Sequence, residues 1–209
     1  MNARSPFIRL ATFALLALLG GCSSGPATRF YTLDPVVAAP AARPQESAAR
    51  AAKPLTIVVT DVRLPQYLDR PQIVTRGSDQ RLRFAEFEHW GGNLRDEMIR
   101  ILAENLGRLL PNDRVIAAPH PVPLQPDYRL ALEVQRFERD ADGRVQLTAR
   151  WWLTRGVDLA PLASPAAAFT GGTVGDGSTD ALVQSMSTVY GELAQAIARS
   201  LPPREASGQ

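Results

Sequence analysis

The sequence predicts a mixed α/β fold in which two long helices pack on a sheet of five to seven strands. Three observations support this class: apolar β-branched runs, two long segments with an apolar stripe at helical spacing, and turns rich in proline and glycine between them. The chain has 209 residues, of which 45% are hydrophobic and 21% are charged. This length and composition suit one folded domain with tails.

The N-terminal segment is predicted to be a lipoprotein signal peptide over residues 1–21. Its apolar run, Leu10–Leu19, spans about half of a hydrocarbon core of roughly 30 Å, so it is too short for a permanent membrane helix. Two arginines precede the run, as in a signal peptide. Leu19, Gly20 and Gly21 come directly before Cys22, the only cysteine of the chain. A lipoprotein signal peptidase requires small residues just before the cut and a leucine three before the cysteine, so we expect cleavage between Gly21 and Cys22.

Cys22 is the predicted site of lipidation. We expect a diacylglycerol on its thiol and a third acyl chain, such as palmitate, on its freed amine. Several acyl chains anchor a protein stably, because each buried CH₂ contributes about 0.8 kcal/mol. Ser23 and Ser24 follow, without the aspartate that commonly retains lipoproteins at the inner membrane. This favours the outer membrane, with the domain facing the periplasm. An ordinary secretory leader with a chance cysteine is the alternative.

The charge balance argues against a polyanionic partner. The whole chain has 23 basic and 21 acidic residues, but two of the basic ones, Arg4 and Arg9, belong to the leader. Removing them leaves 21 of each, so the mature chain is neutral. We therefore expect no binding to nucleic acid and no electrostatic attraction to anionic lipid.

The domain is predicted to begin with two strands that are far apart in sequence. Residues 22–28 form the lipidated tether, and Arg29–Asp34 has the aromatic and β-branched character of a first strand. Residues 35–54 are rich in alanine and proline without a helical stripe, which indicates a flexible loop. Leu55–Val62 is a nearly continuous apolar run, typical of a buried strand.

The middle of the chain predicts a hairpin, a helix and a short strand. Gln72–Arg76 and Gln80–Phe84 pair around a turn that contains Gly77. Glu88–Leu110 predicts the first long helix, and Arg114–Ala117 a short strand after it. The apolar stripe of the helix consists of Leu94, Met98, Ile101, Leu102, Leu106 and Leu109.

The last third of the chain predicts a second hairpin and the second helix. Tyr128–Val134 and Val145–Leu153 alternate apolar and polar residues, with a turn over Asp140–Gly143 between them. Ala167–Thr173 suits another strand. Ser178 is a predicted N-cap for a helix that ends at Leu201. The domain thus covers residues 29–201, and we expect a disordered tail over 202–209.

No catalytic site, metal site or cofactor is predicted. His89 and His120 lack partners at metal-ligand spacing, and no nucleophile elbow is present. The glycine-rich segment Gly171–Gly177 lacks the Gly-Lys-Ser/Thr of a phosphate loop, and Lys53 is the only lysine. We therefore expect a protein that is not an enzyme.

One segment, within residues 62–76, suggests a binding role. Two prolines fix its backbone, and Pro71 holds Arg70 extended. Two interpretations stay open: a rigid structural turn in which Asp69 bonds local amides, or a preorganised partner interface formed by Tyr67, Asp69, Arg70 and Pro71.

Aromatic residues give a second, less specific signal. Phe84, Phe87 and Trp90 lie close together in sequence, and Trp151-Trp152 places one indole on each face of a strand. Such residues fit a core covered on both faces, or a surface that contacts lipid or a partner.

Several motifs in order resemble a known family. They are Gly21–Gly25, Phe30–Leu33, Leu64–Val74, the helical pattern from Trp90 to Leu106, and Val145 with Trp151–Leu153. Together they are similar to the ABC-type transport auxiliary lipoproteins of the PqiC/YmbA type, from the lipobox to the last helix. Gly91-Gly92-Asn93 departs from the Trp-Ala-(Glu/Ser)-Pro-Leu start that many relatives carry there.

The resemblance implies a fold and a function. The fold would be a three-layer α/β/α sandwich with a mixed sheet. The function would be that of a non-enzymatic outer-membrane lipoprotein, serving a tunnel-forming MCE-domain protein that spans the periplasm and its inner-membrane component. Such systems move lipids or other hydrophobic molecules and support envelope integrity, and some members form homo-oligomeric rings. The alternative is a monomeric periplasmic carrier that binds lipid in its own pocket.

Overall fold

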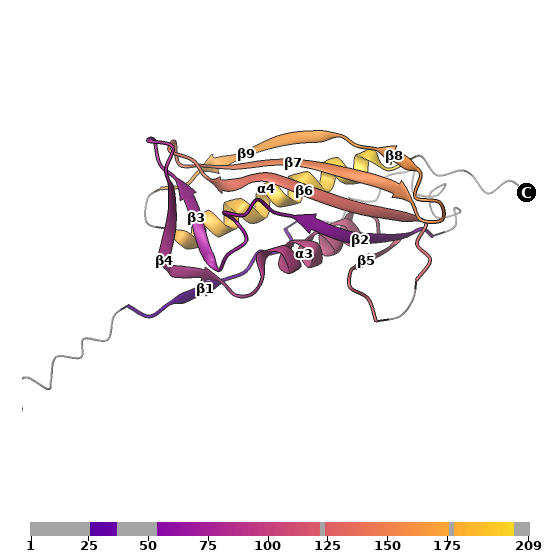
Figure 1. Cartoon of the computed structure of the whole chain (residues 1–209), viewed down its shortest axis with the longest axis horizontal. Coiled ribbons are helices and arrows are strands. Elements are labelled where there is room, and N and C mark those ends of the chain that lie inside the picture. Colours follow the sequence, from indigo (N-terminus) through magenta and orange to yellow (C-terminus); the bar gives the residue numbers. More distant parts are fainter. Residues whose placement is uncertain (1–25, 37–53, 122–123, 176–177, 203–209) are drawn as a thin grey trace, which may run out of the picture.

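The computed structural model describes residues 26–36, 54–121, 124–175 and 178–202 (Figure 1). Nine strands in one mixed sheet and two helices are found in these ranges, so the predicted α/β class is confirmed with more strands than expected. The signal peptide, Cys22, most of the loop over 35–54 and the tail after residue 202 lie outside the described residues.

The centre of the sheet is a long antiparallel hairpin of β6 (Tyr128–Arg139) and β7 (Arg144–Arg155). The predicted turn between them is confirmed: the Gly143 N–H donates to the Asp140 carbonyl at 3.2 Å. Gly143 has a φ of 77°, and a Cβ there would lie 2.9 Å from the Val174 oxygen. Glycine is therefore required by both conformation and space.

Two strands share the other edge of β6. β2 (Thr56–Arg63) pairs in parallel with its first half, as far as Glu133, and β3 (Gln72–Arg76) joins at Arg139. β5 (Arg114–Ala117) extends the sheet beyond β2.

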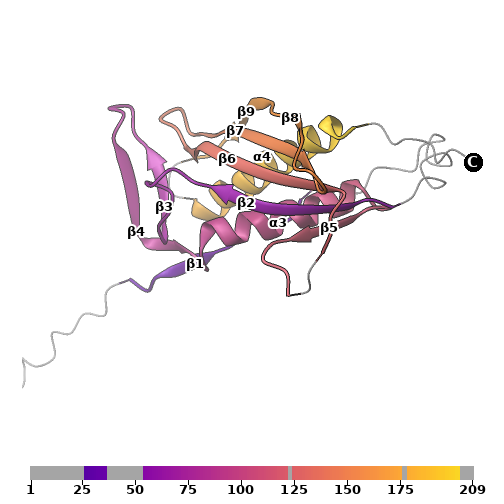
Figure 2. The same ribbon diagram turned by 45° about the vertical axis from the view of Figure 1, so that its right-hand side comes forward.

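The remaining strands complete both sides of the sheet. β4 (Leu82–Trp90) forms an antiparallel hairpin with β3, and this hairpin projects at one end of the molecule (Figure 2). β1 (Arg29–Tyr31) pairs in parallel with the end of β4. On the opposite side, β8 (Pro161–Ala163) and β9 (Ala166–Thr173) both pair with β7.

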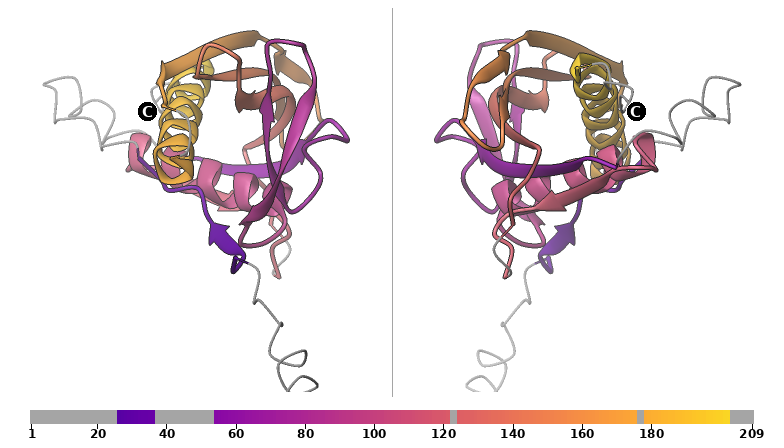
Figure 3. Two further views of the ribbon diagram at one scale, coloured as in Figure 1. Left: turned by 90° about the vertical axis from the view of Figure 1, so that its left-hand side faces the viewer. Right: turned by 90° about the vertical axis from the view of Figure 1, so that its right-hand side faces the viewer.

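The two helices are α3 (Leu94–Leu109) and α4 (Thr179–Ser200), and both begin at a capping side chain. Asn93 accepts from the Asp96 N–H, and Ser178 accepts from the Ala181 N–H as predicted. α3 packs on β2 and β5, whereas α4 packs on β9, β7 and β6 (Figure 3). The Tyr190 hydroxyl of α4 donates to the Met98 carbonyl of α3 at 2.8 Å, so the helices also contact each other.

The helices lie on the same face of the sheet, so the described elements form two layers rather than the expected three. Alternation along the central hairpin explains this layering. The inward positions of β6 and β7 are apolar and buried, whereas outward residues such as Arg129, Glu133, Thr148 and Arg150 stay half-exposed and need no covering helix. One core joins both helices to the sheet, and its members include Val59, Met98, Leu102, Leu132, Phe137, Leu147, Val189 and Leu193.

The structure corrects the predicted helix over Glu88–Leu110. Residues 88–90 belong to β4, which also extends past the predicted strand end at Phe84, and the helix begins only at Leu94. Gly91 and Gly92 separate the two elements, because glycine is a poor helix former and Asn93 supplies the cap.

The described residues contain neither a membrane-spanning helix nor a cluster of metal-ligating side chains. None of their helices combines the length and the apolar character that crossing a membrane requires. Nor do these residues contain a group of three or more His, Cys, Asp or Glu side chains placed to hold a metal ion.

Candidate partner-binding surface

The predicted binding segment, residues 64–71, connects β2 to β3 and is held firmly in place. The Leu68 N–H donates to the Pro65 carbonyl and the Arg70 N–H to the Leu68 carbonyl, both at 2.9 Å. The Leu68 side chain is buried, and the Trp90 N–H donates to the Pro71 carbonyl at 2.7 Å. The segment is therefore rigid, as its two prolines predict.

Tyr67 turns toward the interior. Its hydroxyl lies 2.7 Å from Oε2 of Glu138, a fully buried carboxylate in β6. Oε1 of Glu138 accepts from Nε of Arg76 at 2.9 Å and from Nε of Arg136 at 2.8 Å. Burial, together with the hydrogen bond to this carboxylate, raises the pKa of Tyr67, so its hydroxyl stays protonated and donates. These contacts favour the structural interpretation for Tyr67.

Asp69, Arg70 and Pro71 face outward instead. They line a hollow of about 210 Å³ together with Gly92, Asn93 and Leu94. The Arg70 guanidinium lies 4.2 Å above the ring of Phe84, a cation–π contact that holds the side chain against β4. Nε of Arg70 is buried without a hydrogen-bond partner. The exposed residues of the segment are thus presented by a fixed backbone.

A second hollow adjoins the first. It measures about 310 Å³, shares Gly92 and Asn93 with the first, and is otherwise lined by Thr32, Gly91, Asp96, Glu97 and Arg100. We call the two hollows together the Asp69–Asn93 surface. Gly91-Gly92-Asn93, which departs from the family pattern, lines this surface, although the sequence alone does not indicate that the helix start belongs to it.

Glu97 is an acidic group of this surface that the sequence analysis missed. Its Oε1 accepts from the Leu33 N–H at 2.7 Å, whereas Oε2 is buried without a hydrogen-bond partner. Burial raises the pKa of Glu97, although the Leu33 N–H and the nearby Arg100 oppose the shift. Glu97 thereby ties the chain after β1 to the start of α3.

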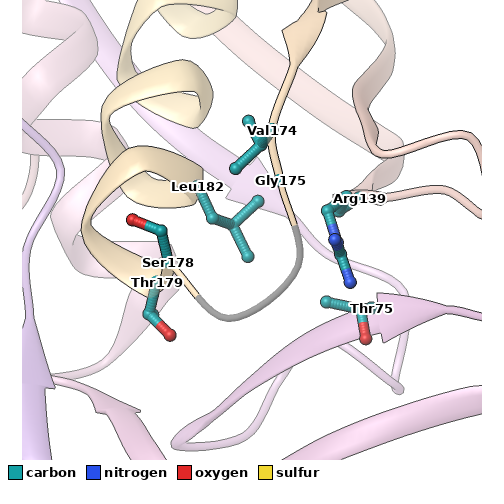
Figure 4. A pocket seen from close by; sticks show the side chains of 7 residues that line it. All are labelled: Thr75, Arg139, Val174, Gly175, Ser178, Thr179 and Leu182. Atoms are coloured by element: carbon teal, nitrogen blue, oxygen red, sulfur yellow. The ribbon is translucent and has the colours of Figure 1, made fainter.

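A third hollow lies at the start of α4 (Figure 4). It measures about 90 Å³ and is smaller than the two hollows of the Asp69–Asn93 surface. Its lining residues are Thr75, Arg139, Val174, Gly175, Ser178, Thr179 and Leu182. The Ser178 hydroxyl is already used as the helix cap.

His89, Gly171 and the aromatic residues noted in the sequence pack against neighbouring elements of the fold or lie on its surface. The ring of His89 meets that of Phe30 edge-on, with the centroids 6.2 Å apart. A Cβ on Gly171 would lie 2.5 Å from Oγ of Ser185, so this glycine allows α4 to approach β9 closely. Among the aromatic residues, Trp90 and Trp151 are in the core, whereas Phe84 is exposed.

Comparison with solved structures supports the fold. A crystal structure of an uncharacterised protein has 21% sequence identity and a TM-score of 0.63, covering 83% of this chain and 98% of its own. The crystal structure of protein XCC0632 from Xanthomonas campestris has 16% identity and a TM-score of 0.63, covering 81% and 92% respectively. At these identities the likeness concerns the fold alone. No curated protein matched the sequence.

Comparison with family models identifies the chain more specifically. The model of the ABC-type transport auxiliary lipoprotein component matches residues 31–198. This range runs from the last residue of β1 to the last turns of α4 and therefore includes the Asp69–Asn93 surface. The chain belongs to the family of ABC-type transport auxiliary lipoprotein components.

Proposed function

We propose that this protein is a non-enzymatic docking subunit of an MCE-type transport system at the outer membrane. Acyl chains on Cys22 hold it there, with the folded domain in the periplasm. Its partners are an MCE-domain protein that spans the periplasm and the inner-membrane component of the same system. The system moves lipids or other hydrophobic molecules and supports envelope integrity, and several copies of the chain form a ring.

The Asp69–Asn93 surface supports docking more than any other feature of the structure. It combines an exposed acid, Asp69, with a half-buried base, Arg70, on a backbone that needs no further ordering to bind. A preorganised surface loses little conformational entropy on association, so more of its contact energy remains as affinity.

The alternative, a carrier that encloses lipid, has less support. The space between helices and sheet is filled by the side chains of one continuous core. The two hollows of the Asp69–Asn93 surface measure only about 310 and 210 Å³, at or below the lower end of the roughly 300–1,000 Å³ of pockets that enclose small ligands.

The docking proposal is tested with the double variant Asp69→Ala/Arg70→Ala. After crosslinking in cells, the acylated protein is purified in mild detergent and its partners are identified by mass spectrometry. We expect the MCE-domain protein to be lost from the eluate. The free energy of unfolding is expected to fall by no more than about 1 kcal/mol, since neither side chain is in the core and the lost cation–π contact with Phe84 contributes about 0.5–1 kcal/mol.

A matched control comes from the turn between β3 and β4. Asp79→Ala/Arg81→Ala removes the same two side-chain types from an exposed pair 3.5 Å apart, outside the Asp69–Asn93 surface. This variant is expected to keep the partner. Equal recovery of the partner with both double variants would contradict the assignment of the surface.

A further inference from the structure

The side chain of Phe30 is unusually exposed for a phenylalanine in a paired strand. It lies in β1 and has 69% of its surface exposed, although its backbone neighbour His89 in β4 touches one edge of the ring. Exposed apolar side chains are common singly, so exposure alone does not indicate a ligand. Phe30 points to a ligand because it also lies only eight residues after Cys22, the predicted lipid anchor.

The chain between Cys22 and the domain is very short. Three residues separate Cys22 from Pro26, where the described domain begins, and a fully extended chain over these four Cα–Cα steps reaches about 14 Å. Residues 26–28 lead directly into β1. An acylated Cys22 therefore keeps the start of β1 within about 25 Å of the anchored residue, since Arg29 is seven Cα steps from Cys22.

The two ends of the molecule differ in their distance from this anchor. β1 and β4 lie at one end of the longest axis, and the connection from β7 to β8 lies at the other (Figure 1). That far connection also exposes apolar side chains, with Val157 exposed at 87% and Leu159 at 59%. Only the β1 end is held near lipid by the short tether.

We infer that the β1 end of the domain rests on the outer membrane with the Phe30 ring in contact with phospholipid. This inference depends on the acylation of Cys22 in the proposed function. Aromatic rings favour the boundary between headgroups and acyl chains. The acyl chains alone fix the distance of the domain from the bilayer but not its orientation, and contact at Phe30 would fix the orientation as well. The Asp69–Asn93 surface then lies beside the membrane, because the Gly91 N–H donates to the Tyr31 carbonyl of β1 at 2.7 Å.

The sequence offers a direct way to test this orientation. Acylation occupies the thiol of Cys22, the only cysteine, so Phe30→Cys introduces a single free thiol for a polarity-sensitive NBD fluorophore. The acylated protein is reconstituted in vesicles of phosphatidylethanolamine and phosphatidylglycerol, some of which contain doxyl-labelled lipid. Val157→Cys, labelled in the same way, is the control at the far end.

We expect the label at position 30 to emit at shorter wavelength and to lose most of its fluorescence to the doxyl lipid. The label at position 157 should emit at the wavelength that it has in water and should not be quenched. Equal emission from both positions would overturn the inference. So would a blue shift at position 30 without quenching by doxyl lipid, because protein rather than lipid would then cover the ring.

Flotation of the same samples separates this inference from the proposal on which it rests. If the protein floats with the vesicles but its label at position 30 emits as it does in water, the proposed orientation is overturned and the proposed anchoring is not. Protein that fails to float overturns both.

Discussion

The two halves of the segment between β2 and β3 differ in what their polar side chains contact. Tyr67 bonds inward to Glu138, where two arginines also donate to the buried carboxylate. Asp69 and Arg70, only two and three residues further on, line an open hollow, and Nε of Arg70 has no hydrogen-bond partner. One short segment thus contains a side chain that stabilises the fold and two that face an open hollow.

This difference means that the segment over residues 64–71 has two separable roles. The inward half keeps the backbone in one conformation, and the outward half presents its groups on that backbone. Substitutions in the inward half should therefore change the free energy of unfolding, and substitutions in the outward half should change recovery of the partner.

The largest effect is expected from Glu138→Ala. It removes the acceptor shared by Arg76, Arg136 and Tyr67, and loss of one partner from a buried ion pair is strongly destabilising. We expect a loss of about 3 kcal/mol, at the low end for such changes because both arginines are partly exposed. Urea unfolding measures it, with Glu133→Ala as the control, since Glu133 is a half-exposed acid on the same strand. Equal stability of the two variants would contradict a structural role for Glu138.

A smaller effect is expected from Tyr67→Phe, which separates the two halves most directly. The variant loses one hydrogen bond to a carboxylate, which costs about 1.5 kcal/mol, but it keeps the ring. Recovery of the MCE-domain protein should be unchanged, in contrast to Asp69→Ala/Arg70→Ala. Tyr128→Phe, at the other end of β6, controls for the loss of a hydroxyl. If Tyr67→Phe lost the partner while keeping its stability, Tyr67 would belong to the interface.

The smallest effect, from Glu97→Gln, depends on pH. Burial raises the pKa of Glu97 above its ordinary value of 4.5, so the folded protein binds this proton more tightly than the unfolded chain does. The contribution of Glu97 to stability is therefore fully present below pH 4.5 and is lost as the pH rises through the raised pKa. Glu97→Gln should consequently be slightly more stable than the wild type at neutral pH. The amide oxygen can still accept from the Leu33 N–H.

Urea unfolding at a series of pH values tests this prediction. The advantage of Glu97→Gln should shrink as the pH falls toward 4.5. A gain that is constant across this range would show that ionisation of Glu97 is not its cause.

Much of the fold follows from local sequence, and the exceptions have physical reasons. The strands Gln72–Arg76 and Arg114–Ala117 and the cap at Ser178 are found as predicted, because each lies next to a clear turn or capping residue. The predicted start of α3 is wrong because residues 88–90 continue β4, and the pairing of β4 with β1 and β3 is a tertiary contact that local sequence does not show. Gly91-Gly92-Asn93, a break followed by a cap, was the signal that marks the true boundary.

The site could be predicted only in part. Proline placement correctly indicated a rigid backbone over residues 64–71, but it did not show which side chains face inward. Glu138 was not identified, since the apolar alternation of β6 shifts at the bulge between Val134 and Arg136 and brings both Phe137 and Glu138 into buried positions. Such a shift depends on pairing with β7 and cannot be read from β6 alone.

The position of β1 also has a consequence for the order of folding. Arg29 pairs with Glu88, 59 residues later, and the Leu33 N–H finds its acceptor, Glu97, 64 residues later. Contacts between such distant residues form slowly, and a three-residue edge strand opens at little free-energy cost. During synthesis the first strand of the domain can therefore dock only after the chain has been made as far as Trp90, at the end of β4. As a three-residue strand at the edge of the sheet, it is expected to reopen readily.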